Sequence, residues 1–122
     1  MTDAAKIADA YISLWNETDA QRRKALINDA WTEDARYVDP IMSGEGRDQI
    51  DGLIAAVHER FPGFRFALIG QPDGHGDHVR FSWALGPEGG EGIIKGTDFA
   101  VVADGRLQTV TGFLDQVPAG AA

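Results

Sequence analysis

The chain contains no cysteine. This absence excludes disulfide bonds, thiol catalysis and zinc sites built on cysteine. No apolar run approaches the ~20 residues of a membrane-spanning helix. The N-terminal stretch MTDAAKIADAYISLW lacks the basic segment and apolar run of a signal peptide. We therefore expect a cytoplasmic protein that is not part of a membrane.

Positive charge is also scarce, because 11 lysines and arginines face 19 acidic residues and leave a net charge of −8. Such a surface repels phosphate backbones and anionic lipids, so we expect neither nucleic acid nor a membrane as a partner. The 122 residues, 43% of them hydrophobic, can build a core without a metal or a disulfide. We expect one domain over residues 1–122.

Apolar residues recur at helical spacing in three segments of the first half. The first segment follows a possible cap at Thr2 or Asp3 and carries Ile7, Tyr11, Leu14 and Trp15. The second follows Asp19, exposes the run QRRK, and has a buried face made of Leu26, Ile27, Ala30 and Trp31. The third begins near Arg47, ends before Pro62 and Gly63, and buries Ile50, Leu53, Ile54, Val57 and Phe61.

The remaining segments have the pattern of strands. A short strand, Ala35 to Asp39, and a loop precede the third helix. Four longer strands are predicted at residues 64–70, 78–86, 91–102 and 106–117, with turn sequences at 72–77, 87–92 and 103–105. In the second of these strands, alternation places His78 and Arg80 on the face opposite that of Val79, Phe81, Trp83 and Leu85. This order predicts an α+β fold in which a curved antiparallel sheet, bent at its internal glycines, wraps around three helices and leaves a cavity.

Three phrases of the sequence resemble one known superfamily. WTEDARYVDP resembles its helix end, first strand and Asp-Pro motif, GRDQIDGLIAAVHERFP its third helix, and GTDFAVVADGRLQTVTGF its last hairpin. The superfamily is the NTF2-like, or SnoaL-like, cone, and the resemblance covers roughly Ala5 to Val117. It implies the cone fold and a homodimer formed through the outer face of the sheet, to which Phe99 and Val101 could contribute.

Ketosteroid isomerase, one branch of that superfamily, resembles the chain more closely at three positions. Its tyrosine on the first helix, its aspartate before a proline and its aspartate on a late strand match Tyr11, Asp39 and Asp98. The resemblance implies a cofactor-independent isomerase in which Asp39 is the base and Tyr11 and Asp98 donate hydrogen bonds to an oxyanion. The spacing from Asp98 to the next turn is one residue shorter than in that enzyme.

The chemistry of proton transfer next to a carbonyl explains why these residue types belong together. It needs a base that takes and returns the proton, and donors at the oxygen where negative charge grows. An aspartate donates only when it is protonated, which an apolar site favours, and ketosteroid isomerase is the standard example. Asp98 alternates with Ile94, Ala100 and Val102 on one strand face, so an unpaired charge would be costly there.

Each of these residues also has a structural interpretation. Asp39 could open a turn before Pro40, Tyr11 could be a core aromatic, and Asp98 could be paired or lie at the cavity edge. The aromatic residues that could either line a pocket for a ring-shaped ligand or pack in the core are Trp15, Trp31, Phe66, Trp83 and Phe113.

The polar candidates are equally open. His58 could act in a pocket or be a half-buried histidine, and His78 and Arg80 could enter the cavity or face solvent. The segment DGHGDH, residues 73–78, offers metal-ligand types, but a glycine-rich hairpin holds ligands poorly, so we interpret it as a solvated turn. We expect no metal and no cofactor.

The expected ligand is a small hydrophobic molecule, and three functions remain open. The first is an isomerase, or a polyketide cyclase of the SnoaL type, that works by proton transfer. The second is an epoxide hydrolase or dehydratase, which would need Arg80 and His78 beside carboxylates. The third is a non-catalytic ligand-binding or dimeric interaction domain.

Overall fold

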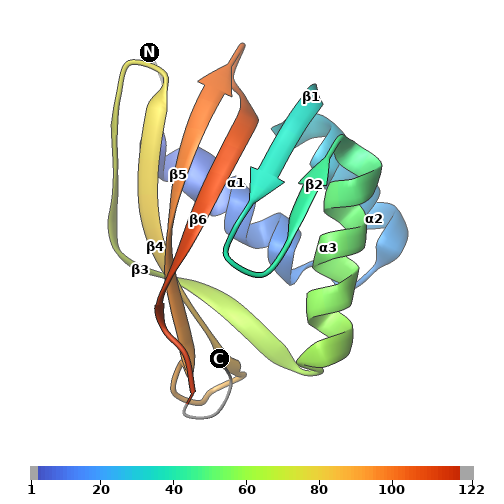
Figure 1. The fold of residues 1–122 in the computed structure, drawn as a ribbon, viewed down its shortest axis with the longest axis vertical. Helices are drawn as coiled ribbons and strands as arrows, with labels where there is room; N and C mark the ends of the chain where they lie inside the picture. The colour runs from blue at the N-terminus through green and yellow to red at the C-terminus, as the bar shows by residue number, and fades with distance from the viewer. Residues whose placement is uncertain (1–2, 119–122) are drawn as a thin grey trace.

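The computed structural model describes residues 3–118, and these form three helices and six strands (Figure 1). The helices are α1 (Ala4–Asn16), α2 (Ala20–Ala30) and α3 (Arg47–Arg60). The strands are β1 (Trp31–Val38), β2 (Ser43–Glu45), β3 (Phe64–His75), β4 (His78–Pro87), β5 (Ile94–Ala103) and β6 (Arg106–Gln116). Within the described residues, no helix is long and apolar enough to span a membrane.

Predicted caps start the first two helices. The side chains of Asp3 and Asp19 accept the backbone N–H groups of Lys6 and Arg22, at 3.1 and 2.9 Å. These bonds satisfy donors that a helix start leaves without a partner. Thr2, the other predicted cap of the first helix, lies outside the described residues. The third helix begins at Arg47 and ends at Arg60, as predicted.

The strands form one sheet in the order β2-β1-β6-β5-β4-β3. Neighbouring strands are antiparallel except β1 and β6, which run parallel. The prediction of a purely antiparallel sheet was therefore wrong at this one pair. The register shifts in β3–β4, at two places in β5–β6 and in β1–β6. Such bulges bend strands and increase their twist, which gives the sheet its predicted curvature.

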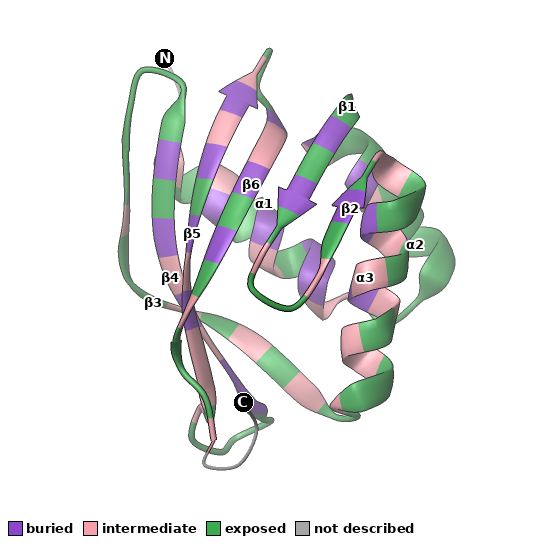
Figure 2. Cartoon of the chain, viewed as in Figure 1, coloured by how far each residue is buried: buried purple, intermediate pink, exposed green. Residues whose placement is uncertain are grey.

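The helices cover the inner face of this curved sheet (Figure 1). α1 packs against β3 and β4, whereas α3 packs against β1 and β2. In β4 and β5, buried residues alternate with more exposed ones (Figure 2). The residues of β4 that were predicted to share one face, Val79, Phe81, Trp83 and Leu85, all lie in the core. The predicted α+β architecture is therefore confirmed.

The strands differ from the prediction in several places, among them β5, which begins at Ile94 rather than at residue 91. β1 begins at Trp31 rather than Ala35, because the backbone of Trp31 is already extended and pairs with Leu107 of β6. The predicted loop before α3 contains the short strand β2, which pairs with β1. β3 continues to His75, because pairing with β4 resumes at Asp73 after the bulge, and the turn shrinks to two residues.

The QRRK run of α2 was predicted to be exposed, but one of its residues is buried. Arg23 is only 5% exposed. Its Nε donates to Asp51 Oδ1 at 2.6 Å and its guanidinium also donates to the carbonyl oxygen of Glu17 at 3.1 Å. A buried charge needs such partners, and this pair links α2 to α3.

Candidate functional site

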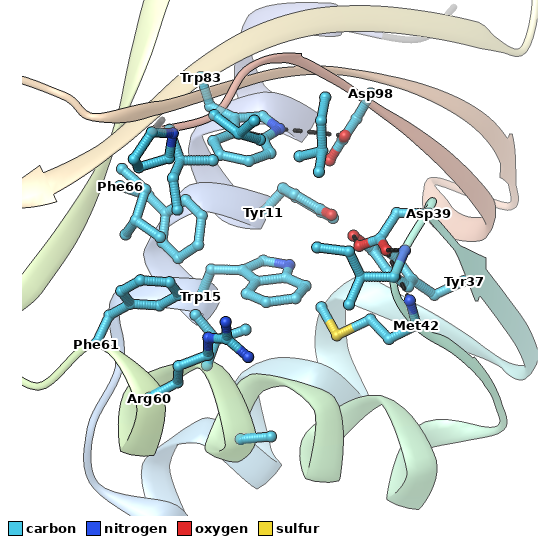
Figure 3. A pocket seen from close by; sticks show the side chains of 18 residues that line it. Tyr11, Trp15, Tyr37, Asp39, Met42, Arg60, Phe61, Phe66, Trp83 and Asp98 are labelled. Carbon is cyan, nitrogen blue, oxygen red and sulfur yellow. Dashed lines mark hydrogen bonds between the residues drawn. The ribbon is translucent and has the colours of Figure 1, made fainter. Parts of the chain in front are cut away.

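A cavity of about 240 Å³ lies between the inner face of the sheet and the helices. Most of its wall is apolar, with Trp15, Phe66 and Trp83 among the aromatic residues. The side chains that carry polar or charged groups at its wall, apart from the indoles, are Tyr11, Tyr37, Asp39, Asp98 and Arg60. Figure 3 shows the first four gathered at one end and Arg60 across Trp15 from them.

Asp98, on β5, is 1% exposed, and no cationic side chain among residues 3–118 pairs with it. Its Oδ1 accepts the indole N–H of Trp83 at 3.1 Å. Burial raises the pKa of Asp98 to about 6, although the hydrogen bonds from Trp83 and Tyr11 act in the opposite direction. A carboxyl group with such a pKa can carry or lose a proton near neutral pH.

Tyr11 reaches the same end of the cavity from α1, where it is buried on the apolar helix face. Figure 3 shows its hydroxyl between Asp98 and Asp39. Burial, followed by the nearby Asp98 carboxyl, raises the pKa of Tyr11 well above its usual value of 10.0. The hydroxyl therefore keeps its proton and is available as a hydrogen-bond donor.

Asp39 lies just beyond the end of β1, and its carboxylate accepts three hydrogen bonds. The backbone N–H groups of Ile41 and Met42 donate to Oδ1 at 2.8 and 2.9 Å, and the hydroxyl of Tyr37 donates to Oδ2 at 2.6 Å. Asp39 therefore opens a turn and lines the cavity at once, so the two interpretations of its sequence are compatible. Its three donors fix the orientation of the carboxylate.

Gly112 of β6 allows the two acids to approach each other. It pairs with Asp98 of the neighbouring strand β5. A Cβ at Gly112 would lie 2.8 Å from Asp98 Oδ1, 3.3 Å from Asp39 Cβ and 3.5 Å from the Tyr37 hydroxyl oxygen. The missing side chain thus leaves the space in which residues of β1 and β5 meet across β6.

Gly96 of β5 leaves the space that the indole ring of Trp83 occupies. A Cβ there would lie 2.4 Å from Cζ2 of Trp83. Only a glycine lets the indole lie this close to β5, from where its N–H reaches Asp98.

Asn16 and His58 hold the aromatic wall in place. The side chain of Asn16 both donates to and accepts from the backbone of Phe66, at 2.9 and 2.7 Å. His58 Nε2 lies 2.6 Å from the carbonyl oxygen of Trp15. His58 therefore links α3 to α1 and does not line the cavity that it was predicted to reach. The indole N–H of Trp15 is buried without a hydrogen-bond partner in the described residues.

The predicted site residues that line the cavity are Tyr11, Trp15, Asp39, Phe66, Trp83 and Asp98. Trp31 does not line it, since it is fully buried in the core beside Tyr11, at 6.3 Å between ring centroids. His78 and Arg80 are on the outer face of the sheet. They alternate along β4 with Val79 and Phe81, which point inward. Arg80 pairs there with Asp73 at 3.0 Å.

Phe113 also points outward and is 52% exposed. Counting by twos along β6 from the buried Leu107 would place Phe113 inside. The register shift between Val101 and Val102 of β5 moves the inward positions of β6 to Val110 and Gly112. A slip of one residue turns every following side chain to the opposite face.

Two polar residues of the cavity wall, Tyr37 and Arg60, were not predicted. Tyr37 lies two residues before Asp39 on an extended strand, so the period of two could have placed both on one face. Arg60 follows Val57 by three residues on α3, which places it near the same helix face. The sequence could therefore have indicated Tyr37 from its spacing to Asp39, and Arg60 from its place beside the apolar face of α3.

A curved sheet that wraps around three helices and encloses a cavity is the architecture of the NTF2-like α+β cones. A family model described as SnoaL-like domain matches residues 8–110. The chain therefore belongs to the SnoaL-like family. A comparison with curated proteins found no match.

Solved structures agree with this assignment. One from Agrobacterium tumefaciens, described as "a putative isomerase of the SnoaL-like family", is 47% identical with a TM-score of 0.89, over 94% of this chain and 99% of its own. Two more distant structures share the fold. A "putative SnoaL-like polyketide cyclase" from Jannaschia is 17% identical with a TM-score of 0.71, over 94% and 90% of the two chains. A protein from Catenulispora acidiphila with a ketosteroid isomerase-like fold, solved with trimethylamine, is 19% identical with a TM-score of 0.74, over 90% and 85%.

Proposed function

We propose that the cavity catalyses proton transfer next to the carbonyl of a small hydrophobic molecule, as an isomerase or a cyclase would. The observation that carries this proposal is the convergence of Asp39, Asp98 and Tyr11 at one end of an apolar cavity. An apolar wall strengthens electrostatic interactions and excludes water from the reacting groups. The names of relatives in the family, isomerase and polyketide cyclase, are consistent with this chemistry.

Asp39 is the proposed base. Its carboxylate removes the proton from the carbon beside the carbonyl, and the electron pair of the broken C–H bond moves toward the carbonyl oxygen to form an enolate. In an isomerase, Asp39 returns the proton to a different carbon. In a cyclase, the enolate carbon instead attacks a second carbonyl carbon and forms the ring bond. The π electrons of that carbonyl move to its oxygen, which takes the proton from Asp39 and becomes a hydroxyl group. Neither route needs an oxidant or a reductant.

Tyr11 and Asp98 are the proposed donors to the enolate oxygen. The raised pKa of Tyr11 keeps its hydroxyl protonated. Asp98 donates in its protonated form, which its pKa of about 6 already favours in mildly acidic solution. An apolar ligand that covers Asp98 would remove further water and shift the pKa in the same direction.

The test follows the ultraviolet absorbance of a β,γ-unsaturated cyclic ketone as it isomerises to the conjugated ketone. We expect the native protein to accelerate the reaction and Asp39→Asn to lose roughly 10²- to 10⁴-fold in kcat/KM, the usual contribution of a general base. Asp9→Asn, at an exposed position of α1, removes the same charge as a control. Equal rates for native protein and Asp39→Asn would exclude Asp39 from the mechanism.

The second candidate function is ligand binding without catalysis. One observation favours it: the relative from Catenulispora acidiphila was solved with trimethylamine. Aromatic rings beside carboxylates suit an ammonium ion. Calorimetric titration with trimethylamine, combined with an absence of turnover, would favour this function. The hydrolase alternative depended on Arg80 and His78, and neither lines the cavity.

The homodimer and the cytoplasmic location remain part of the proposal. Phe99 and Phe113 form a T-shaped pair at 5.7 Å on the outer face of β5 and β6, and Phe99 is 45% exposed. Val101 is a partly buried neighbour on β5. Sedimentation velocity should give a dimer for the native protein and a monomer for Phe99→Lys. A native monomer would remove the dimer from the proposal.

A further inference from the structure

The cavity of this protein has a cation at the end opposite its acids. Arg60 is the cationic residue among the residues that line it. Figure 3 shows its guanidinium across Trp15 from Tyr11 and Asp98. The neighbouring wall is apolar and includes Ala56, Val57 and the aromatic ring of Phe61.

Arg60 is an exposed residue at the end of α3, and it differs from four other arginines of the chain. Arg23, Arg36 and Arg80 pair with carboxylates, and Arg47 donates to backbone carbonyls of Trp31 and Asn28. Within residues 3–118, no salt bridge or side-chain hydrogen bond involves Arg60. Its guanidinium carbon lies 5.7 Å from the ring centroid of Phe61, which keeps the charge beside the cavity wall.

We propose that the substrate carries an anionic group, a carboxylate, which Arg60 binds while the carbonyl of the same molecule faces Tyr11 and Asp98. The position of the carbonyl rests on the proposed function. An anion otherwise meets a chain with a net charge of −8 and a cavity with two carboxyl groups. A planar guanidinium binds a carboxylate through two parallel N–H donors, so Arg60 supplies the needed attraction.

The volume of the cavity limits the size of this substrate. About 240 Å³ lies below the roughly 300–1,000 Å³ of pockets that hold drug-sized ligands. The inferred substrate is therefore a compact oxo acid with one or two rings and an apolar middle that contacts Trp15 and Phe66.

The test compares two probes of equal shape, 3-(4-hydroxyphenyl)propanoate and its primary amide, by calorimetric titration. Their phenol resembles an enol, and only the first carries a charge at the other end. We expect the native protein to bind the propanoate roughly fivefold more tightly than the amide, since exposed ion pairs contribute modestly. The preference should decrease in high salt.

Arg60→Gln should remove the preference without weakening the amide, and Arg60→Lys should keep part of it. Arg65→Gln, at an exposed position of β3 outside the cavity wall, removes the same charge as a matched control and should leave the preference unchanged. Equal binding of both probes, binding of neither, or a preference that survives Arg60→Gln would overturn the proposal.

Binding and turnover separate this inference from the proposed function. A charge preference that depends on Arg60, without isomerisation of any ketone, would remove the reaction and keep the anion site. Turnover of a neutral ketone without a charge preference would do the reverse. With an anionic ketone as substrate, Arg60→Gln should raise KM and leave kcat nearly unchanged, because the contact is equal in ground and transition states.

Discussion

Asp39 and Asp98 lie at the same end of one cavity but in opposite surroundings. Asp39, beyond the end of a strand, is partly exposed and accepts two backbone N–H groups and the hydroxyl of Tyr37. Asp98, in the middle of a strand, is almost fully buried and accepts the indole N–H of Trp83. Under the proposed mechanism, this contrast would let one residue type serve as base in one place and as hydrogen-bond donor in another, because burial disfavours the charged form of Asp98.

The largest expected effect concerns stability. The pKa of Asp98 is raised from 3.8 to about 6 on folding, so its protonated form stabilises the fold below pH 4, and this contribution is lost as pH rises through about 6. Asp98→Asn, which cannot ionise, should raise the free energy of unfolding by on the order of 3 kcal/mol above pH 7 and change it little near pH 4.

Urea unfolding of native protein and Asp98→Asn from pH 4 to pH 8 measures this difference. Asp9→Asn, which changes an exposed carboxylate of α1, should show no comparable trend. A difference between native protein and Asp98→Asn that is independent of pH would mean that burial does not set the protonation of Asp98.

The pH dependence of activity separates the proposed roles of the two acids. If protonated Asp98 donates to the enolate, kcat/KM should fall about tenfold per pH unit above the pKa of about 6. In Asp98→Asn the amide donates at every pH, so this fall should disappear. Initial rates between pH 5 and pH 8 measure it. A rise through the same range would assign the base to Asp98 rather than Asp39.

Gly112→Ala should disturb both acids at once. The new Cβ would lie within 3.3 Å of atoms of Asp98 and Asp39, so we expect a loss of about 2 kcal/mol in the free energy of unfolding, typical of overpacking, and a lower kcat. Gly52→Ala, with nothing within 4 Å of the new Cβ, should instead stabilise α3 slightly. Thermal unfolding and the ketone assay check both. An unchanged Gly112→Ala protein would show that the acids do not depend on this gap.

Tyr37→Phe should have the smallest effect, because it removes one of three donors to Asp39. The lost bond of 2.6 Å leaves the carboxylate of Asp39 less well oriented. We expect the activation free energy to rise by about 1 kcal/mol, which is a fivefold lower kcat, with little change in KM. In the Asp39→Asn background the same change should cost nothing further, because the two residues act together. Additive losses would contradict a positioning role for Tyr37.

Much of the fold could be predicted from the sequence, and the reasons are local. Periodic apolar positions located the helices, aspartate caps marked two helix starts, and alternation identified the buried face of β4. The same alternation placed Asp98 among apolar neighbours, and the structure buries it there. His78 and Arg80 were candidates although alternation already placed them opposite Val79 and Phe81.

Other features depended on contacts between distant segments. The bulge in β5–β6 turned Phe113 outward, and the parallel pairing of β1 with β6 drew Trp31 into a strand and into the core. The burial of Arg23 depended on Asp51 of another helix. None of these contacts leaves a local pattern in the residues that make them.

The sequence by itself determined the three helices and five of the six strands in their order, and the presence of two aspartates and a tyrosine suited to acid–base chemistry. Only the tertiary structure decided that these side chains meet, that Tyr37 holds Asp39, and that Arg60 borders the same cavity. The physical reason is range. Periodicity and capping act over a few residues, whereas burial, hydrogen bonding and the pKa of Asp98 depend on strands and helices that come together only in the folded chain.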